Sequence, residues 1–378
     1  MTPPGVRARE PFGVYVHVPF CASRCGYCDF NTYVGLGRDG FADAVLAEWA
    51  LARRALGDAP PAATVFVGGG TPTLLDPGEL ERILAAIRRA PGAEVTVEAN
   101  PDTIDAARLA SLRRAGVTRL SLGMQSAVPH VLATLERTHT PGAAVRAARL
   151  AREAGFEHVS LDLIHGTPGE TDADWAASLD AVLAAAVDHV SAYPLEILPG
   201  TRLHARVRRG ALPAPDDDAQ ARRYAMADAA FARAGLHWYE LCNWAASSAA
   251  RCAHNLGYWR SQDWWGLGPG AHSHVGGERW WNVLHPARYA ALTTTGRSPA
   301  AGRERLTPAQ RRIERTLLEL RLAEGLVLED PGSAAPLTAD GLLEPEALAR
   351  GRAVLTQAGR LQADRVAREL LAPVSAAA

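Results

Sequence analysis

Three cysteines lie within eight residues near the start of the chain, in the order Cys21-Ala-Ser-Arg-Cys25-Gly-Tyr-Cys28. Cysteine thiolates hold iron–sulfur clusters, normally four of them for a [4Fe–4S] cube. Three thiolates from a single loop would bind three irons and leave the remaining iron open to chelate the amino and carboxylate groups of a small molecule. The C-x3-C-x2-C spacing therefore predicts a [4Fe–4S] cluster on Cys21, Cys25 and Cys28, with Tyr27 limiting the access of water.

Two other interpretations of these cysteines are a structural zinc site completed by His17 or Asp29, and buried free thiols. Structural zinc sites usually combine two C-x2-C pairs that are well separated in sequence. This region contains a single such pair, and it directly follows a predicted strand. The cluster is therefore the favoured interpretation.

Unusual polar or glycine-rich groups also follow the later predicted strands. Residues 68–72 read Gly-Gly-Gly-Thr-Pro after the second strand, Glu98 ends the third and Gln125 follows the fourth. Asp162 lies on the fifth. Parallel α/β barrels place their functional sites at the C-terminal ends of the strands. We expect these groups to meet there.

The elements that must position them alternate along the first 235 residues. Short β-branched runs predict strands, and Ala/Leu/Arg-rich amphipathic runs predict helices between them. Such alternation favours parallel strands with crossover helices, and we expect a partial (β/α)6 TIM-like barrel, open on one side. The predicted strands are 14–18, 64–67, 94–98, 119–122, 158–164 and 189–193, and the predicted helices are 41–56, 77–90, 105–115, 142–154 and 172–186.

The composition and periodicity of the sequence change after a predicted loop at 211–218 and a predicted helix at 219–234. Residues 237–281 hold seven of the nine tryptophans and little helical periodicity. A Gly/Pro/Arg-rich linker at 296–305, helices at 308–323 and 344–358, and a short apolar hairpin-like end are expected next. We predict a disordered N-terminus (1–10), a barrel (11–235), an aromatic-rich segment (236–295) and a small helical C-terminal domain (296–378), with residues 375–378 frayed.

The composition is that of a globular protein, with 48% hydrophobic and 21% charged residues and a net charge of −1. This balance gives no global field that would attract nucleic acid or an anionic membrane, so no nucleic-acid partner is expected. Neither a signal peptide nor a membrane span is predicted. An odd number of cysteines, five, argues against a disulfide framework and predicts a cytoplasmic protein.

Six sequence motifs, in order along the chain, resemble the radical S-adenosylmethionine (SAM) superfamily, and within it the coproporphyrinogen dehydrogenase-like HemN/HemW group. They are Tyr15-Val-His-Val-Pro-Phe-Cys21 with Cys28-Asp-Phe30, Gly68-Gly-Gly-Thr-Pro72, Glu98-Ala-Asn-Pro101, Gly123-Met-Gln-Ser126, Asp162-Leu-Ile-His-Gly-Thr-Pro168 and His254-Asn-Leu-Gly-Tyr-Trp259.

The resemblance implies a SAM pocket next to the cluster. Gly69, Gly70 and Thr71 would bind the methionyl amino group. Glu98 would bind the ribose diol. A phosphate cradle or a tight turn is the alternative for the glycine loop, and ordinary hydrogen bonding at the barrel mouth is the alternative for the other residues. The remaining implied SAM residues are Gln125, Asp162, Arg137, which could meet the SAM carboxylate, and Tyr15, which would pack near the cluster.

His254 could be an axial ligand of heme iron, since imidazole commonly ligates heme. A core histidine with both ring nitrogens satisfied is the alternative, and elementary chemistry alone favours it. The resemblance favours heme, because HNxxYW is a feature of the HemW-type heme chaperones. Cys242 and Cys252 could form a second metal site, but buried inert thiols are the better interpretation.

Two functions remain within the resembled group. The dehydrogenases carry a further cysteine two residues after the third, where this chain has Phe30, and they have a longer extension before the motif than the 20 residues here. Both features predict a heme chaperone with heme, an acceptor protein and an electron donor as partners. The alternative is an oxygen-independent coproporphyrinogen III dehydrogenase; no catalytic residue is assigned.

Overall fold

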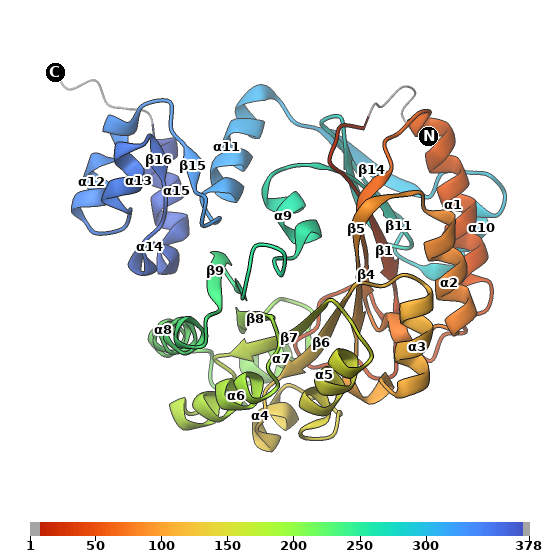
Figure 1. Ribbon diagram of the computed structural model, residues 1–378, viewed down its shortest axis with the longest axis horizontal. Coiled ribbons are helices and arrows are strands. Elements are labelled where there is room, and N and C mark those ends of the chain that lie inside the picture. Colours follow the sequence, from red (N-terminus) through yellow and green to blue (C-terminus); the bar gives the residue numbers. More distant parts are fainter. Residues whose placement is uncertain (1–7, 373–378) are drawn as a thin grey trace.

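The computed structural model describes residues 8–372, and within them six parallel strands form the curved sheet that the sequence predicts (Figure 1). The sheet order around the curve is β1-β4-β5-β6-β7-β8. The prediction of a partial (β/α)6 barrel is confirmed. The strands are β1 (Phe12–Val18), β4 (Ala62–Gly69), β5 (Arg89–Ala99), β6 (Arg119–Gln125), β7 (His158–His165) and β8 (His189–Pro194).

Side chains alternate across these strands, because successive residues of a strand point to opposite faces, and the register shifts only near Ala62 and at the end of β6. One face is aliphatic and fully buried under the helices, as Val65, Val67, Val95 and Val97 show. Burying one such side chain contributes about 1.5–3 kcal/mol, so this face holds the barrel together. The other face lines the lumen and is mostly polar, with Thr96, Glu98, Arg119, Ser121, Ser160, Asp162, His189 and Ser191.

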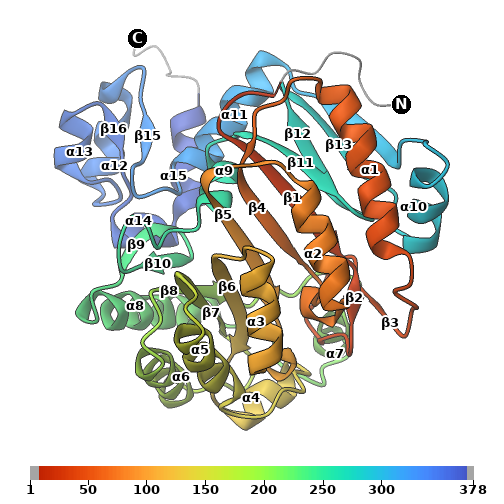
Figure 2. The same ribbon diagram turned by 45° about the vertical axis from the view of Figure 1, so that its right-hand side comes forward.

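Helices cover the aliphatic face of the sheet (Figure 2). Predicted helix 41–56 agrees with α1. Predicted helix 77–90 is too long, because α2 ends before Pro91 and Gly92 and residues 89–93 instead extend β5. The helices up to residue 233 are α1 (Phe41–Leu56), α2 (Pro77–Ala86), α3 (Ala106–Arg114), α4 (Pro129–Thr134), α5 (Ala143–Glu153), α6 (Asp172–Ala184), α7 (Arg202–Arg208) and α8 (Asp217–Arg233), with short 3-10 turns at Pro72–Leu74 and Pro101–Thr103. Of these, α4 and α7 lie beside the cysteine loop (residues 21–28) rather than on the aliphatic face.

The aromatic-rich segment extends the sheet at both edges, which the sequence did not predict. β11 (Asp263–Leu267) pairs parallel to β1, and β10 (Asn243–Ala245) pairs antiparallel to β8. Aromatic side chains suit strands, and the barrel edges offer unpaired backbone groups. The remaining strands of this sheet are β9 (His237–Glu240), β12 (His272–Val275), β13 (Glu278–Asn282) and β14 (Ala300–Arg305).

β14 occupies most of the predicted linker 296–305, so that prediction is wrong. The sheet also continues across residues 235 and 295, and the domain boundaries placed there stay predictions. Helix α9 (Ala253–Trp259) lies within the curve of the sheet, and α10 (Pro286–Thr293) packs on α1 (Figure 1).

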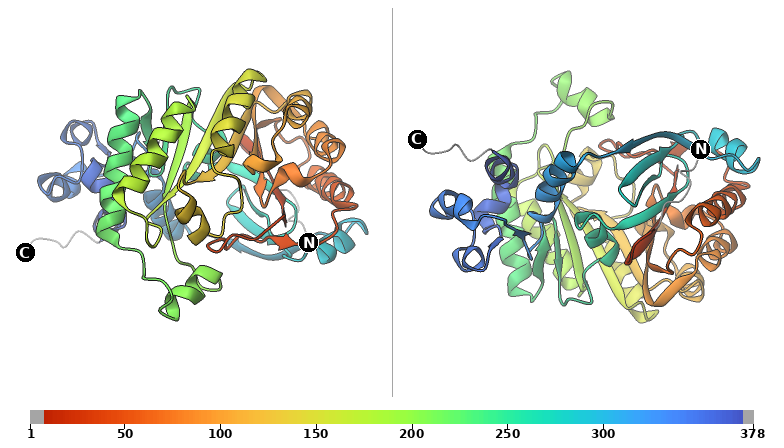
Figure 3. Two further views of the ribbon diagram at one scale, coloured as in Figure 1. Left: turned by 90° about the horizontal axis from the view of Figure 1, so that it is seen from below. Right: turned by 90° about the horizontal axis from the view of Figure 1, so that it is seen from above.

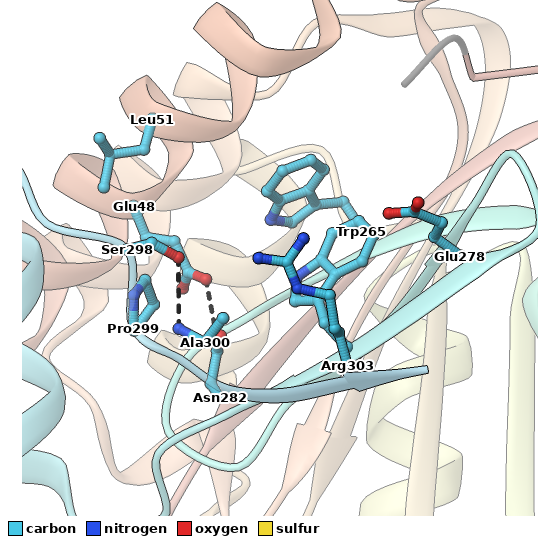
Figure 4. A pocket seen from close by; sticks show the side chains of 10 residues that line it. Glu48, Leu51, Trp265, Glu278, Asn282, Ser298, Pro299, Ala300 and Arg303 are labelled. Carbon is cyan, nitrogen blue, oxygen red and sulfur yellow. Dashed lines mark hydrogen bonds between the residues drawn. The ribbon is translucent and has the colours of Figure 1, made fainter. Parts of the chain in front are cut away.

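Glu48 of α1 links the aromatic-rich segment to the barrel through three hydrogen bonds. Its carboxylate accepts from the Asn282 side chain at 2.7 Å, the Gly268 amide at 2.8 Å and the Tyr289 hydroxyl at 2.5 Å. Figure 4 shows Glu48 and Asn282 facing each other beside a small cavity of about 20 Å³. Burial raises the pKa of Glu48 to about 7, and these three donors oppose that rise.

The C-terminal region has a core of its own, built around Leu320, Leu337, Leu343, Leu355 and Val366. It lies to one side of the barrel in the views from below and above (Figure 3). Its elements are α11 (Pro308–Glu319), β15 (Leu326–Val327), a 3-10 turn (Pro331–Ala334), α12 (Ala335–Ala339), α13 (Pro345–Ala349), β16 (Arg352–Ala353), α14 (Gln357–Leu361) and α15 (Ala363–Leu371).

Two predictions for this region are wrong. Residues 344–358 do not form one helix, because Gly351 adopts a positive φ of 77° and the chain turns into β16. The expected hairpin-like end is the helix α15, whose Val366 and Ala367 are buried against the same core. The predicted fraying at 375–378 and most of the predicted disorder at 1–10 lie outside the described residues.

No helix within residues 8–372 is long and apolar enough to cross a membrane.

Candidate functional site

All twelve predicted site residues line one cavity of about 800 Å³ inside the curve of the sheet. This volume lies within the usual range of about 300–1,000 Å³ for ligand pockets. The cavity runs from the cysteine loop, at the C-terminal strand ends, down to helix α9. The lining residues that were predicted are Cys21, Cys25, Cys28, Tyr15, Gly69, Gly70, Thr71, Glu98, Gln125, Arg137, Asp162 and His254.

The cysteine loop is held by backbone hydrogen bonds. β2 (Phe20–Cys21) pairs with β3 (Tyr33–Val34), and the Gly26 amide donates to the Leu135 carbonyl at 3.0 Å. The three thiols are half-buried at the cavity mouth. Burial raises the pKa of the Cys21 and Cys28 thiols, so thiolates there need cationic partners.

Arg137 and Thr71 each donate a hydrogen bond to one of the three sulfurs. The Arg137 Nη1 donates to the Cys25 sulfur at 3.6 Å, and the Thr71 hydroxyl donates to the Cys21 sulfur at 3.9 Å. Iron binds thiolate rather than thiol, so a cationic donor beside the sulfur favours the metal-binding form. The thiol set, its position on the cavity wall and the adjacent guanidinium fit a [4Fe–4S] cluster held by three cysteines.

The zinc alternative lacks its fourth ligand in this structure. His17 has both ring nitrogens engaged, with the Tyr15 hydroxyl at 3.0 Å and the Asn31 carbonyl at 2.9 Å. Asp29 is exposed at the rim of the cavity. Across residues 8–372, no group of three or more His, Cys, Asp or Glu side chains is close enough to hold a single metal ion.

The glycine loop presents no free amides for a phosphate. The amide of Gly69 donates to the Glu98 carboxylate at 2.9 Å, that of Gly70 to the Val18 carbonyl at 2.7 Å and that of Thr71 to the Phe20 carbonyl at 2.8 Å. A Cβ on Gly70 would lie 2.5 Å from the Phe20 oxygen, so only glycine fits. The loop suits a ligand that donates, such as an amino group.

Two carboxylates occupy the middle of the cavity. Glu98 faces the glycine loop, and Asp162 accepts from the hydroxyls of Ser121 at 2.8 Å and Ser160 at 3.3 Å. Burial raises the pKa of Glu98 to about 7, and the Gly69 amide opposes the rise. Burial also raises the pKa of Asp162, whereas hydrogen bonds from the three surrounding serine hydroxyls oppose that rise. A ribose diol could donate hydrogen bonds to either carboxyl group once that group is ionised.

Gln125 and Arg137 lie where the backbone is strained. Gln125 has φ 62° at the end of β6, and Glu136, just before Arg137, has φ 56°. Non-glycine residues with such φ values are uncommon and gather at ligand sites. Arg137 donates to the Gly123 carbonyl at 2.7 Å, while its buried Nε has no partner and remains able to bind an acceptor such as a carboxylate.

His254 is buried, with both ring nitrogens hydrogen-bonded. Its Nδ1 pairs with the Thr64 hydroxyl at 2.8 Å and its Nε2 with the Tyr258 hydroxyl at 2.9 Å. The ring stacks on Phe66 at 5.3 Å, and burial lowers the pKa of His254 to about 4. The imidazole is therefore neutral, but iron ligation would require one of these hydrogen bonds to break. Its role as a heme ligand stays a prediction.

Cys252 is buried and Cys242 is partly buried, and the interpretation of both as inert thiols stays a prediction. Cys252 donates to the Glu94 carboxylate at 3.6 Å. Burial raises the pKa of both thiols, which keeps them protonated. Both nevertheless line the cavity, as does Phe30.

The sequence reasoning missed the lower layer of the lumen, which contains Glu94, Thr96 and Arg119. The Glu94 carboxylate pairs with the Arg119 Nε at 3.0 Å and accepts the amides of Ala253 at 3.1 Å and His254 at 3.0 Å, so it fixes the start of α9. The sequence did contain a signal for this layer. Glu94 and Thr96 lie four and two residues before Glu98 on the same strand, so their side chains must face the same side of the sheet as that of Glu98.

Comparisons with known proteins agree with this geometry. A family model described as the radical SAM superfamily matches residues 15–182. The heme chaperone HemW of Mycobacterium tuberculosis (strain H37Rv) is 50% identical, over 96% of this chain and 95% of its own. The heme chaperone HemW of Bacillus subtilis is 34% identical, over 82% and 84%.

Among solved structures, the coproporphyrinogen III oxidase HemN of Escherichia coli superposes with a TM-score of 0.80. The match covers 95% of this chain and 90% of that one, at 22% sequence identity. At that identity the likeness concerns the fold.

Proposed function

The chain belongs to the HemW family of the radical SAM superfamily, and from this premise we propose that it is a heme chaperone that delivers heme to acceptor proteins. It contains a [4Fe–4S] cluster and binds exchangeable SAM. The observation that supports this most directly is the single cavity shared by the cysteine loop, the glycine loop and the HNxxYW helix. Cluster, SAM and heme chemistry would thus meet in one space.

The cavity residues have distinct tasks in this proposal. Cys21, Cys25 and Cys28 hold the cluster, and Arg137 offsets the charge of the thiolates. Gly69, Gly70 and Thr71 bind the methionyl amino group, and Glu98 accepts from the ribose hydroxyls. When bound and reduced, a cluster of this kind supplies the electron that cleaves SAM to a 5′-deoxyadenosyl radical. The remaining predicted SAM contacts are Gln125, Asp162, Tyr15 and Arg137, whose unpartnered Nε is available to the SAM carboxylate.

The mouth of the cavity distinguishes the two functions within the group. Phe30 stands where the dehydrogenases carry a further cysteine, and its side chain is 55% exposed beside the cluster loop. A large exposed apolar ring at a cavity mouth suits the docking of a flat apolar ligand. The coproporphyrinogen III dehydrogenase is the second candidate, supported by the fold shared with HemN.

The proposed setting is the cytoplasm, with an acceptor protein and an electron donor as partners. All five cysteines are free, as expected where thiols are kept reduced.

A paired experiment on anaerobically purified, cluster-loaded protein tests the proposal. Heme is titrated by absorbance, and separate samples receive coproporphyrinogen III, SAM and a reductant. Saturable, stoichiometric heme binding without a decarboxylated product is expected. Decarboxylated product with weak, non-saturating heme uptake would favour the dehydrogenase instead. The control is Cys25→Ser, in which any product made by the cluster must disappear.

A further inference from the structure

Four side chains in the wall of the cavity have buried polar atoms without a partner, namely Thr32, Thr96, Arg119 and Arg137, and two of these, Thr96 and Arg119, lie deep in the barrel. Thr96 is 0% exposed and Arg119 1% exposed, and neither the Thr96 hydroxyl nor the Arg119 Nη1 makes a hydrogen bond. Both side chains line the large cavity. An unmatched buried polar group costs about 1–3 kcal/mol. The Thr96 hydroxyl and the Arg119 Nη1 lie in the same wall, which points to a ligand group that would form hydrogen bonds with both.

The two groups are neighbours. Thr96 of β5 and Arg119 of β6 are register partners on adjacent parallel strands. Such strands lie about 4.8 Å apart, and paired residues project from the same face of the sheet. Both atoms are donors, and one of them belongs to a cation. Their natural complement is an oxygen anion, and a carboxylate with its two oxygens fits such a pair of donors.

The other two guanidinium nitrogens of Arg119 are hydrogen-bonded, so the position of the free Nη1 is fixed. Its Nε donates to Glu94 at 3.0 Å, and its Nη2 donates to the carbonyls of Ala250 at 2.9 Å and Arg251 at 3.0 Å. Glu94 balances the charge of the guanidinium without occupying Nη1. The pocket is therefore built before a ligand arrives.

Its position separates it from the predicted SAM residues. Thr96 precedes Glu98 by two residues on β5, which places it about 7 Å deeper in the barrel. On its other side Thr96 is in register with Phe66, the ring on which His254 stacks. The pair thus lies next to the HNxxYW helix and on the side of Glu98 away from the cysteine loop.

We propose that Thr96 and Arg119 form a carboxylate subsite at the base of the cavity. The carboxylate is either a heme propionate or that of a small organic acid. The first assignment rests on the proposed function, whereas the subsite itself does not.

Thr96→Val is the decisive variant. It removes the hydroxyl, keeps the side-chain shape and breaks no hydrogen bond of the protein, because that hydroxyl has none. Thr167→Val is the matched control, since the Thr167 hydroxyl is also buried without a partner but does not line the cavity. Arg119→Gln is less informative, because it also removes the bonds to Glu94, Ala250 and Arg251.

The first measurement uses acetate, the smallest probe with a methyl-bearing carboxylate. Thermal unfolding of the cluster-loaded proteins is followed against acetate concentration at constant ionic strength, and the acetate Kd is taken from the shift. Loss of one hydrogen bond to a charged group should weaken acetate binding roughly tenfold in Thr96→Val, with Thr167→Val unchanged. Equal responses of the wild type and Thr96→Val would overturn the subsite.

The second measurement identifies the source of the carboxylate by titrating heme and heme dimethyl ester. A roughly tenfold loss for heme in Thr96→Val, with the ester binding all three proteins alike, assigns the subsite to a propionate. Acetate binding that depends on Thr96, with unchanged heme affinity, assigns it to a small organic acid. If the wild type binds no heme, the proposed function fails, and the acetate result alone judges the subsite.

Discussion

Replacing His254 by glutamine separates a buried structural histidine from a heme ligand. The imidazole joins β4 to α9 through the Thr64 and Tyr258 hydroxyls, at 2.8 and 2.9 Å, and is 3% exposed. Burial lowers the pKa of His254 from 6.5 to about 4. The ring is therefore uncharged in the folded protein at neutral pH, and it stays uncharged well below the pH at which an exposed histidine takes up a proton.

This lowered pKa makes part of the stability dependent on pH. As the pH falls below 6.5, the unfolded chain binds a proton at His254 and the folded chain does not, so the free energy of unfolding decreases until about pH 4. At pH 4.5, two pH units below 6.5, proton uptake by the unfolded chain has lowered the free energy of unfolding by about 2.7 kcal/mol. Glutamine does not titrate. The variant should be about 1–2 kcal/mol less stable than the wild type at pH 7.5, and this difference should reverse by pH 4.5.

Urea unfolding of both proteins at pH 7.5, 6.0 and 4.5 measures the effect. The other buried histidines titrate equally in both proteins and cancel in the comparison. Thr64→Val is the control, because it removes one partner but leaves the imidazole able to titrate, so it should keep the slope of the wild type. A stability difference between wild type and His254→Gln that does not change with pH would refute the argument that His254 is neutral in the folded state.

The same variant tests heme ligation. If His254 ligates iron, His254→Gln loses heme affinity while the cluster absorbance remains. Thr64→Val frees one ring nitrogen and should bind heme at least as tightly as the wild type. Unchanged heme binding in His254→Gln would remove His254 as a ligand.

Three further predictions concern the cluster, SAM and the C-terminal region. Cys25→Ser should lose most of the bound iron on anaerobic reconstitution, whereas Cys252→Ser should retain it; equal iron contents would contradict the role of the cysteine loop. SAM affinity, measured by equilibrium dialysis from pH 6 to 8, should increase as Glu98, with its pKa of about 7, ionises and becomes an acceptor, and Glu98→Gln should abolish this dependence. Arg360→Ala should cost about 3 kcal/mol, because it breaks a largely buried pair with Asp228 at 2.6 Å, and protease should then cut the C-terminal region first; an unchanged cleavage pattern would contradict this anchoring role.

The barrel could be predicted from the sequence because a local residue pattern specifies each of its strands. Each has an aliphatic face of alternating residues and is followed by a turn or cap, so residues 158–164 and 189–193 agree with β7 and β8 within a residue. The edges could not be read in this way. β11 pairs with β1 over some 250 intervening residues, and no local pattern specifies that partner.

The sequence by itself determined which residues surround the upper part of the cavity, at the C-terminal ends of the strands. Parallel strands bring their C-terminal ends to one edge, so polar residues placed in or after the last part of each strand must meet one another, and Cys21, Glu98 and Asp162 do. The tertiary structure alone decided the state of the lower layer. The hydrogen bonds of Arg119 and His254 come from residues 131 and 190 positions away, so their free and occupied atoms follow only from how the chain closes on itself. For this reason the sequence could name His254 but not show that both its nitrogens are engaged, and it gave no sign that Thr96 and Arg119 each keep a donor free.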